Sequence, residues 1–182
     1  VLLPARVRPH VMAFYAFARV ADDVADAPHA PQSTPQHKLD QLHAMAAQLT
    51  SGAADPYPHV YALWQSLQAT KIPIHHAEDL LKAFAWDVEH PRTADWSALM
   101  AYCALSAAPV GRYLIDLMGG VDGDDYSASD ALCAALQVLN HVQDIKEDFV
   151  DLGRVYLPQD WLISEGVKDA ELGYLESLQN VL

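Results

Sequence analysis

The sequence predicts an all-α fold, a helical bundle formed by a single domain over residues 1–182. Stretches without glycine or proline carry apolar residues at the spacing of a buried helix face, and prolines cluster in the short segments between them. No segment alternates apolar and polar residues over a useful length, so half-buried strands are not expected. Hydrophobic residues make up 52% of the chain and charged residues 19%, which excludes a largely disordered protein.

Four helices are expected in the first half of the chain. Pro9, Pro58 and Pro73 each suit the first turn of a helix, where the missing N–H has no partner to lose. Pro28 and Gly52 end the first two helices. The expected ranges are residues 10–27, about 36–49, 58 onward, and 73–90.

Three more helices are expected in the second half. Asp95 suits the N-cap of a long helix that reaches residue 119, and Pro109 should kink it. Ser127 or Ser129 suits the cap of a helix reaching residue 152, and a last helix is expected from about residue 168 to the end. The chain does not begin with methionine and its last helical pattern has no stop signal, so we expect a domain incomplete at both ends.

The charge and the cysteines exclude several classes of protein. A formal net charge of −13 argues against a nucleic-acid partner, which would favour a basic face. Cys103 and Cys133 have no metal-ligand or redox spacing and are interpreted as reduced thiols. No uninterrupted apolar run reaches the roughly 18 residues of a membrane span, and no secretory signal is visible. We expect a cytoplasmic protein; these criteria do not test peripheral attachment to a membrane.

The first acidic motif lies on the first expected helix. Tyr15, Arg19, Asp22 and Asp26 follow one another at steps of four, three and four residues, so they share one face of the helix. The rest of the helix is apolar on nearly every side, so we expect it to be buried all round, with the polar face lining a cavity. Carboxylates one turn apart repel each other unless a cation intervenes. With Asp23, three carboxylates exceed the single arginine, which indicates a hard divalent cation such as Mg²⁺. The alternative is a solvated acidic helix end.

The second acidic motif repeats this pattern near residue 140. A set of polar residues, mostly amides and carboxylates, shares one helix face: Gln137, Asn140 (or His141), Asp144, Glu147 and Asp148. Two such helices facing each other would need metal ions and a diphosphate to balance their charge. A carboxylate-bridged metal pair without phosphate competes with this hypothesis, but neither motif has the Glu-x-x-His pattern such a pair usually requires.

Arg154 follows the second acidic motif directly and could reach back to a phosphate, since guanidinium binds phosphate through two hydrogen bonds. On sequence alone the interpretation as an exposed loop arginine is favoured over this role. Arg6, Arg8 and Arg112 are weaker candidates for the same role.

The runs FYAFARVADDVAD and QVLNHVQDIKEDF…GRVYLP resemble the two aspartate-rich signatures of the squalene/phytoene synthase family. LLPARVRPHV, YCALSAAPVGR and NHVQD resemble its bacterial hydroxysqualene synthase branch. The resemblance implies an isoprenoid synthase fold around a central cavity, in which Asp22, Asp26, Asp144 and Asp148 bind Mg²⁺ that holds a prenyl diphosphate. It implies assisting roles for Asp23 and Glu147. Contacts with the diphosphate or the reacting carbons are implied for Tyr15, Arg19, Gln137, Asn140 and Arg154, and Tyr15 and Arg19 join the four aspartates as the expected catalytic set.

The resemblance also implies a reaction, the conversion of presqualene diphosphate to hydroxysqualene. The first alternative is head-to-head condensation of two farnesyl or geranylgeranyl diphosphates to squalene, dehydrosqualene or phytoene. A non-catalytic helical partner of a synthase complex and a di-metal oxidase are alternatives from other classes. The oligomeric state is not predicted.

Overall fold

The computed structural model describes residues 3–28, 33–121, 123 and 125–173. Helices occupy most of this part of the chain, and the one isolated bridge in it joins Arg92 and Val155. The all-α prediction is therefore confirmed. The helical segments are α1 (Arg8–Asp26), α2 (Pro35–Ser51), α3 (Pro58–Thr70), α4 (His75–Glu89), α5 (Trp96–Ser106), α6 (Ala108–Met118), α7 (Ser127–Gln143), α8 (Ile145–Glu147), the π-helical η2 (Asp148–Leu152), α9 (Gln159–Ser164) and α10 (Asp169–Leu172).

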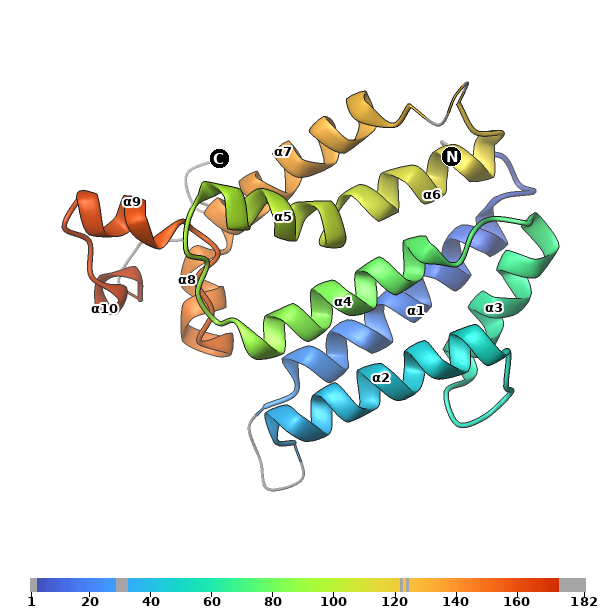
Figure 1. Ribbon diagram of the computed structural model, residues 1–182, viewed down its shortest axis with the longest axis horizontal. Coiled ribbons are helices and arrows are strands. Elements are labelled where there is room, and N and C mark those ends of the chain that lie inside the picture. The colour runs from blue at the N-terminus through green and yellow to red at the C-terminus, as the bar shows by residue number, and fades with distance from the viewer. Residues whose placement is uncertain (1–2, 29–32, 122, 124, 174–182) are drawn as a thin grey trace.

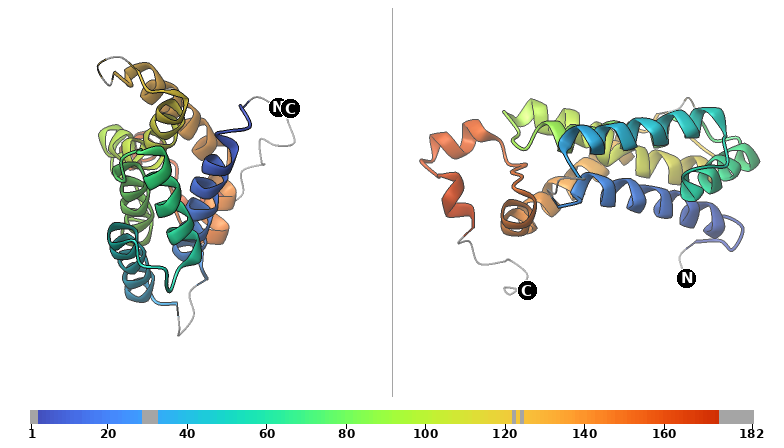
Figure 2. Two further views of the ribbon diagram at one scale, coloured as in Figure 1. Left: turned by 90° about the vertical axis from the view of Figure 1, so that its right-hand side faces the viewer. Right: turned by 90° about the horizontal axis from the view of Figure 1, so that it is seen from below.

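The longer helices lie side by side and form an elongated bundle (Figures 1 and 2). Helix α4 is central, because it contacts α1, α2, α5 and α6, while α7 packs on α5 and α6. The core contains Phe14 and Phe17 of α1, Leu42 of α2, Leu63 of α3 and Tyr113 of α6. The rings of Phe14 and Tyr113 stack with their centroids 4.1 Å apart, which ties the first helix to the sixth.

Helix α1 buries one face rather than its whole circumference. Phe14, Phe17 and Ala21 are at most 5% exposed and face the core. Met12 and Tyr15 lie on the other side and are 58% and 60% exposed in the described part of the chain. The expectation that this helix is buried all round was therefore wrong, although the acidic stripe does lie away from the core face.

The long helix predicted after Asp95 is interrupted as expected. Asp95 is its N-cap, accepting a hydrogen bond from the backbone N–H of Ala98 at 2.8 Å. The break between α5 and α6 falls at Ala107, two residues before Pro109. Proline cannot donate a backbone hydrogen bond and its ring crowds the preceding turn, so the helix is disturbed upstream of it.

The stretch Trp96–Met118, which spans α5 and α6, is long and apolar enough by length and composition to cross a membrane. This candidate is not visible as an uninterrupted apolar run, because Arg112 and Asp116 lie within it. Such a stretch is weak evidence for a span, since core helices pass the same test. Its two charged residues are paired within the bundle: Arg112 with Asp130, and Asp116 with His76 and Tyr126.

The helix predicted to run to residue 152 is divided. Helix α7 ends at Gln143, Asp144 interrupts it, and the chain continues as α8 and then as the π-helical η2. The predicted serine caps are wrong, because Tyr126 is the N-cap residue and makes no side-chain cap. Helix α9 was not predicted. The last predicted helix, from about residue 168 to the end, is represented by α10, and its residues 174–182 lie outside the described part of the chain.

Gly52 ends α2 in a left-handed conformation, with φ at 71°, and a Cβ there would lie 2.4 Å from the Trp64 ring. We expect Gly52→Ala to lower the free energy of unfolding by more than the roughly 1–2 kcal/mol that left-handed backbone alone costs an L-residue. Gly120→Ala is the matched control, because Gly120 has φ at 77° and nothing within 4 Å of the added Cβ. Equal losses in urea unfolding would contradict the packing explanation.

Candidate functional site

The segment that follows the second acidic motif turns back onto it. Gly153 adopts the left-handed conformation, with φ at 68°, that glycine tolerates best. The turn allows the backbone N–H of Arg154 to donate to the carbonyl of Asp148 at 3.0 Å. Val155 then donates to the carbonyl of Pro91 at 2.9 Å, which fixes the segment against the loop between α4 and α5. Arg154 is thereby held beside the motif it follows.

Arg154 joins the two acidic motifs. Its Nη1 lies 2.5 Å from Oδ1 of Asp26, a residue 128 positions earlier, and its Nη2 donates to the carbonyl of Ala25 at 3.0 Å. The Arg154 side chain is 8% exposed. An exposed loop arginine is therefore excluded, and the guanidinium both pairs with the first motif and satisfies the carbonyl end of α1.

A cavity of about 260 Å³ lies where the two motifs meet. It takes lining residues from α1, α4, α5, α7, the segment around η2 and the loop after it. Seven of the residues predicted for the site line it: Asp22, Asp26, Gln137, Asn140, Asp144, Asp148 and Arg154. The remaining lining residues are Leu80, Ala83, Phe84, Asp87, Tyr102, Ser106, His141, Leu152 and Tyr156.

Negative charge predominates in this cavity, because five aspartates and one arginine line it. Burial and the nearby Asp26 raise the pKa of Asp22. Burial and the nearby Asp144 raise the pKa of Asp148 to about 7. Both shifts have the physical cause expected for carboxylates that share a site without enough positive charge.

Four predicted residues do not line the cavity. Tyr15 is 60% exposed on α1, and Arg19 pairs on the surface with Asp22 and Asp23 at 2.8 and 2.7 Å. The Asp23 side chain is 56% exposed and is not among the residues that line the cavity. Glu147 is not a lining residue, although its Oε2 is buried without a hydrogen-bond partner among the described residues. Functional roles for these four residues stay predictions.

Four polar residues of the cavity were not predicted from the sequence: Asp87, Tyr102, Ser106 and Tyr156. Asp87 stands within an apolar stretch, and a charge at such a position was a signal that could have found it. From the sequence, His141 was considered for the polar face only as the alternative to Asn140, and it fits no metal-binding spacing. It is 6% exposed, and burial lowers its pKa to about 4.

The donor set of the cavity fits a hard divalent cation together with a phosphate. Its carboxylate oxygens are the ligands that Mg²⁺ prefers, and their negative charge exceeds that of the single arginine. The hydroxyl of Ser106 is buried in this lining without a partner among the described residues, which leaves a hydrogen-bonding group for a bound molecule or water. In the described part of the chain no three side chains of His, Cys, Asp or Glu are grouped closely enough to hold a metal ion by themselves.

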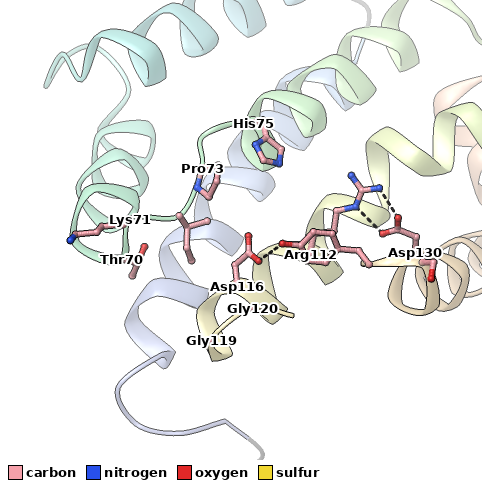
Figure 3. A pocket seen from close by; sticks show the side chains of 12 residues that line it. Thr70, Lys71, Pro73, His75, Arg112, Asp116, Gly119, Gly120 and Asp130 are labelled. Carbon is pink, nitrogen blue, oxygen red and sulfur yellow. Dashed lines mark hydrogen bonds and ion pairs between the residues drawn. The ribbon is translucent and has the colours of Figure 1, made fainter. Parts of the chain in front are cut away.

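A larger cavity, of about 730 Å³, lies at the other end of the bundle (Figures 1 and 3). Its charged residues are largely paired with each other or with neighbours. Arg112 points at Asp130 and donates to it at 2.6 and 2.9 Å, and Asp116 accepts from Tyr126 at 2.6 Å. The smaller cavity is therefore the better candidate, because its excess charge is not balanced within the protein.

The family profile for squalene/phytoene synthases matches residues 1–181. The chain belongs to the squalene/phytoene synthase family. This membership agrees with the paired aspartate motifs and with the all-α bundle that carries them.

Known members of the family match most of this chain. It is 41% identical over 177 residues to a hydroxysqualene synthase of Sinorhizobium fredii. The matched segment covers 97% of this chain and 59% of that protein. It is 35% identical to a phytoene synthase of Rhodobacter capsulatus, over 91% of this chain and 48% of that protein. A crystal structure of the squalene synthase HpnC from Alicyclobacillus acidocaldarius superposes with a TM-score of 0.76 and 32% identity, over 93% of this chain and 63% of that one. The chain thus spans less than two thirds of the length of each of these relatives.

The raised pKa of Asp148 predicts how stability depends on pH without metal. Because its pKa in the folded state is about 7 against an unfolded value near 4, the folded protein holds a proton that the unfolded chain releases. Stability contributed by protonated Asp148 should fall as pH rises from about 4 to about 7. We expect Asp148→Asn to flatten this slope and to raise the free energy of unfolding at pH 8 by on the order of 1–3 kcal/mol.

This expectation is tested by denaturant unfolding between pH 4 and pH 8 in the presence of a chelator. The exposed Asp151, three residues away in the same segment, provides the control variant Asp151→Asn. A slope that is the same in wild type and in Asp148→Asn would contradict the assignment.

Proposed function

We propose that this protein is a Mg²⁺-dependent enzyme that processes a prenyl diphosphate in the cavity between its two aspartate motifs. The observation that carries the proposal is the meeting of Asp26, Asp148 and Arg154 at one cavity with an unbalanced excess of carboxylates. A diphosphate with its metal ions would balance this charge, whereas a neutral ligand would not.

The side chains of the cavity have distinct proposed roles. Asp22 and Asp26 on one side and Asp144 and Asp148 on the other would hold Mg²⁺. Bound Mg²⁺ would neutralise the diphosphate and make it a better leaving group. Arg154 would add a fixed positive charge at the same place.

Two amides complete the polar lining. Gln137 and Asn140 project from α7 at a spacing of three residues, so both reach the cavity from one helix face. Their N–H groups would donate to diphosphate oxygens and orient the substrate. Leu80, Ala83 and Phe84 of α4 provide apolar lining that suits a hydrocarbon chain.

For the reaction we propose the conversion of presqualene diphosphate to hydroxysqualene. The C–O bond to diphosphate breaks, with its electron pair leaving on the diphosphate, and the rearranged carbocation forms a new C–O bond with water, which releases a proton. The greater identity to a hydroxysqualene synthase, 41%, than to a phytoene synthase, 35%, supports this branch. Head-to-head condensation of two prenyl diphosphates is the alternative, and product analysis separates the two.

The proposal also covers the cellular location and the partners of the protein. We place it in the cytoplasm, in peripheral contact with a membrane, because the product is a long apolar molecule. The net charge of −13 supports the absence of a nucleic-acid partner. A non-catalytic helical partner of a synthase complex is the alternative from another class. Loss of Mg²⁺-dependent turnover in variants of the two motifs would exclude this alternative.

Mutation of one carboxylate from each motif tests the enzyme assignment. We expect Asp22→Asn and Asp144→Asn each to lower Mg²⁺-dependent diphosphate release by about 10²–10³-fold. Each substitution removes a charged ligand of the Mg²⁺ that offsets the negative charge of the leaving group. Asp40→Asn on α2 is the control, since Asp40 is exposed and pairs with Gln36 away from the cavity. Unchanged turnover in both motif variants would favour the non-catalytic partner.

Thermal unfolding with Mg²⁺ and farnesyl thiodiphosphate tests the ligand set directly. We expect the two together to raise Tm substantially and each alone to raise it little, because the carboxylates and the diphosphate share the metal ion. Asp144→Asn should abolish most of the joint shift. A Tm that responds to neither ligand in the wild-type protein would remove the main support for a diphosphate site.

A further inference from the structure

Asp87 carries a buried carboxylate within the lining of the cavity. It projects from the last turns of α4 and is 6% exposed. Its Oδ2 accepts a hydrogen bond from the hydroxyl of Tyr102 at 2.9 Å, and its Oδ1 accepts one from the hydroxyl of Tyr156 at 2.9 Å. One carboxylate therefore fixes two phenol groups that come from different elements, α5 and the loop after η2.

Burying a carboxylate at this position costs free energy. Burial is the main cause that raises the pKa of Asp87, to about 6. The nearby guanidinium of Arg154 is hydrogen-bonded to Asp26 and Ala25 rather than to Asp87. The two hydroxyls that donate to the carboxylate offset this cost, because an apolar side chain in its place would leave both phenols unpaired.

The two tyrosines held by Asp87 belong to an aromatic layer that lines the cavity. The rings of His141 and Tyr156 stack with centroids 3.9 Å apart, and Tyr102 lies 5.2 Å from Tyr156 and 5.7 Å from His141. All three residues line the same cavity as the aspartate motifs. Because both hydroxyls donate to Asp87, their oxygen lone pairs stay available as acceptors.

We infer that Asp87 is a positioning residue for the reaction: it orients the hydroxyls of Tyr102 and Tyr156 so that two electron-rich phenol groups face the reacting carbons. The inference rests on the proposed function. Asp87 itself does not contact the substrate and acts only by holding the two tyrosines. A carbocation that forms when diphosphate leaves is stabilised by such aromatic groups and by oxygen dipoles held in fixed directions. Loss of the carboxylate lets both hydroxyls rotate and lose that orientation.

Asp87→Asn in the full-length protein is the primary test, with presqualene diphosphate as substrate and Mg²⁺ in excess. Asparagine keeps the shape but offers one carbonyl oxygen and one N–H₂, so it cannot accept from both tyrosines. We expect kcat to fall by about 10–100-fold with KM changed less than about 3-fold, since orientation is lost and diphosphate binding is kept.

The protein contains a matched control in Asp116. This carboxylate also accepts from two side chains, Tyr126 at 2.6 Å and His76 at 2.8 Å, but it lines the larger cavity instead (Figure 3). We expect Asp116→Asn to lower Tm as much as Asp87→Asn does while changing kcat per folded molecule by less than about 2-fold. Equal losses of kcat in the two variants would overturn the inference, because destabilisation alone would then explain both.

The coupling between Asp87 and its tyrosines gives a readout that a structural role would not move. In a Tyr102→Phe, Tyr156→Phe background, Asp87→Asn should lower kcat by less than about 2-fold further, because the groups through which it acts are already absent. The same loss of kcat in both backgrounds would overturn the inference. Should Asp87→Asn not fold, Tyr156→Phe replaces it, and an unchanged kcat in that isosteric variant is the overturning result.

Failure of this inference differs from failure of the proposed function. A wild-type protein that shows no Mg²⁺-dependent release of diphosphate refutes the proposed function and the inference together. An active wild type with a fully active Asp87→Asn variant refutes the inference and leaves the proposed function standing.

Discussion

The contact between Arg154 and the end of α1 is the interaction on which the site depends. A single guanidinium binds the carboxylate of Asp26 and the carbonyl of Ala25, and so joins the first aspartate motif to the segment that follows the second. The left-handed Gly153 and the hydrogen bond from Arg154 to the Asp148 carbonyl make this approach possible.

The site is arranged at the expense of local stability. Asp22, Asp87 and Asp148 all have pKa values raised mainly by burial, which means that the folded protein holds carboxylates in an environment that disfavours their charge. Apolar residues would stabilise the bundle more. An arrangement of this kind is typical of sites whose charge is balanced by a ligand, and it favours the small, charged cavity over the larger one at the other end of the bundle.

Much of the fold was predictable because it depends on local rules. Helix ends followed proline and glycine, as at Pro28 and Gly52, and the cap at Asp95 was recognised from its residue type. The division of the second acidic helix at Asp144 was not predictable, because no proline or glycine marks it and the following turns pack as η2 against tertiary neighbours. Helix α9 is only Gln159–Ser164, too short for a periodic apolar pattern to establish itself.

The sequence by itself determined the helical class, the family and the aspartates of the two motifs, because their spacing of three and four residues places them on one face of any helix that contains them. Only the tertiary structure decided which other residues share their cavity. Asp87, Tyr102, His141 and Tyr156 come from separate segments, and no spacing in the sequence links them. They meet because α4 and α7 both pack on α5 and because the loop after η2 returns to the same cavity. The same packing leaves Asp23 outside the cavity, since rotation of α1 about its axis is set by the buried face of Phe14, Phe17 and Ala21. Tyr15 and Arg19 share the face of Asp22 and Asp26 but lie nearer the start of α1, and they do not line the cavity.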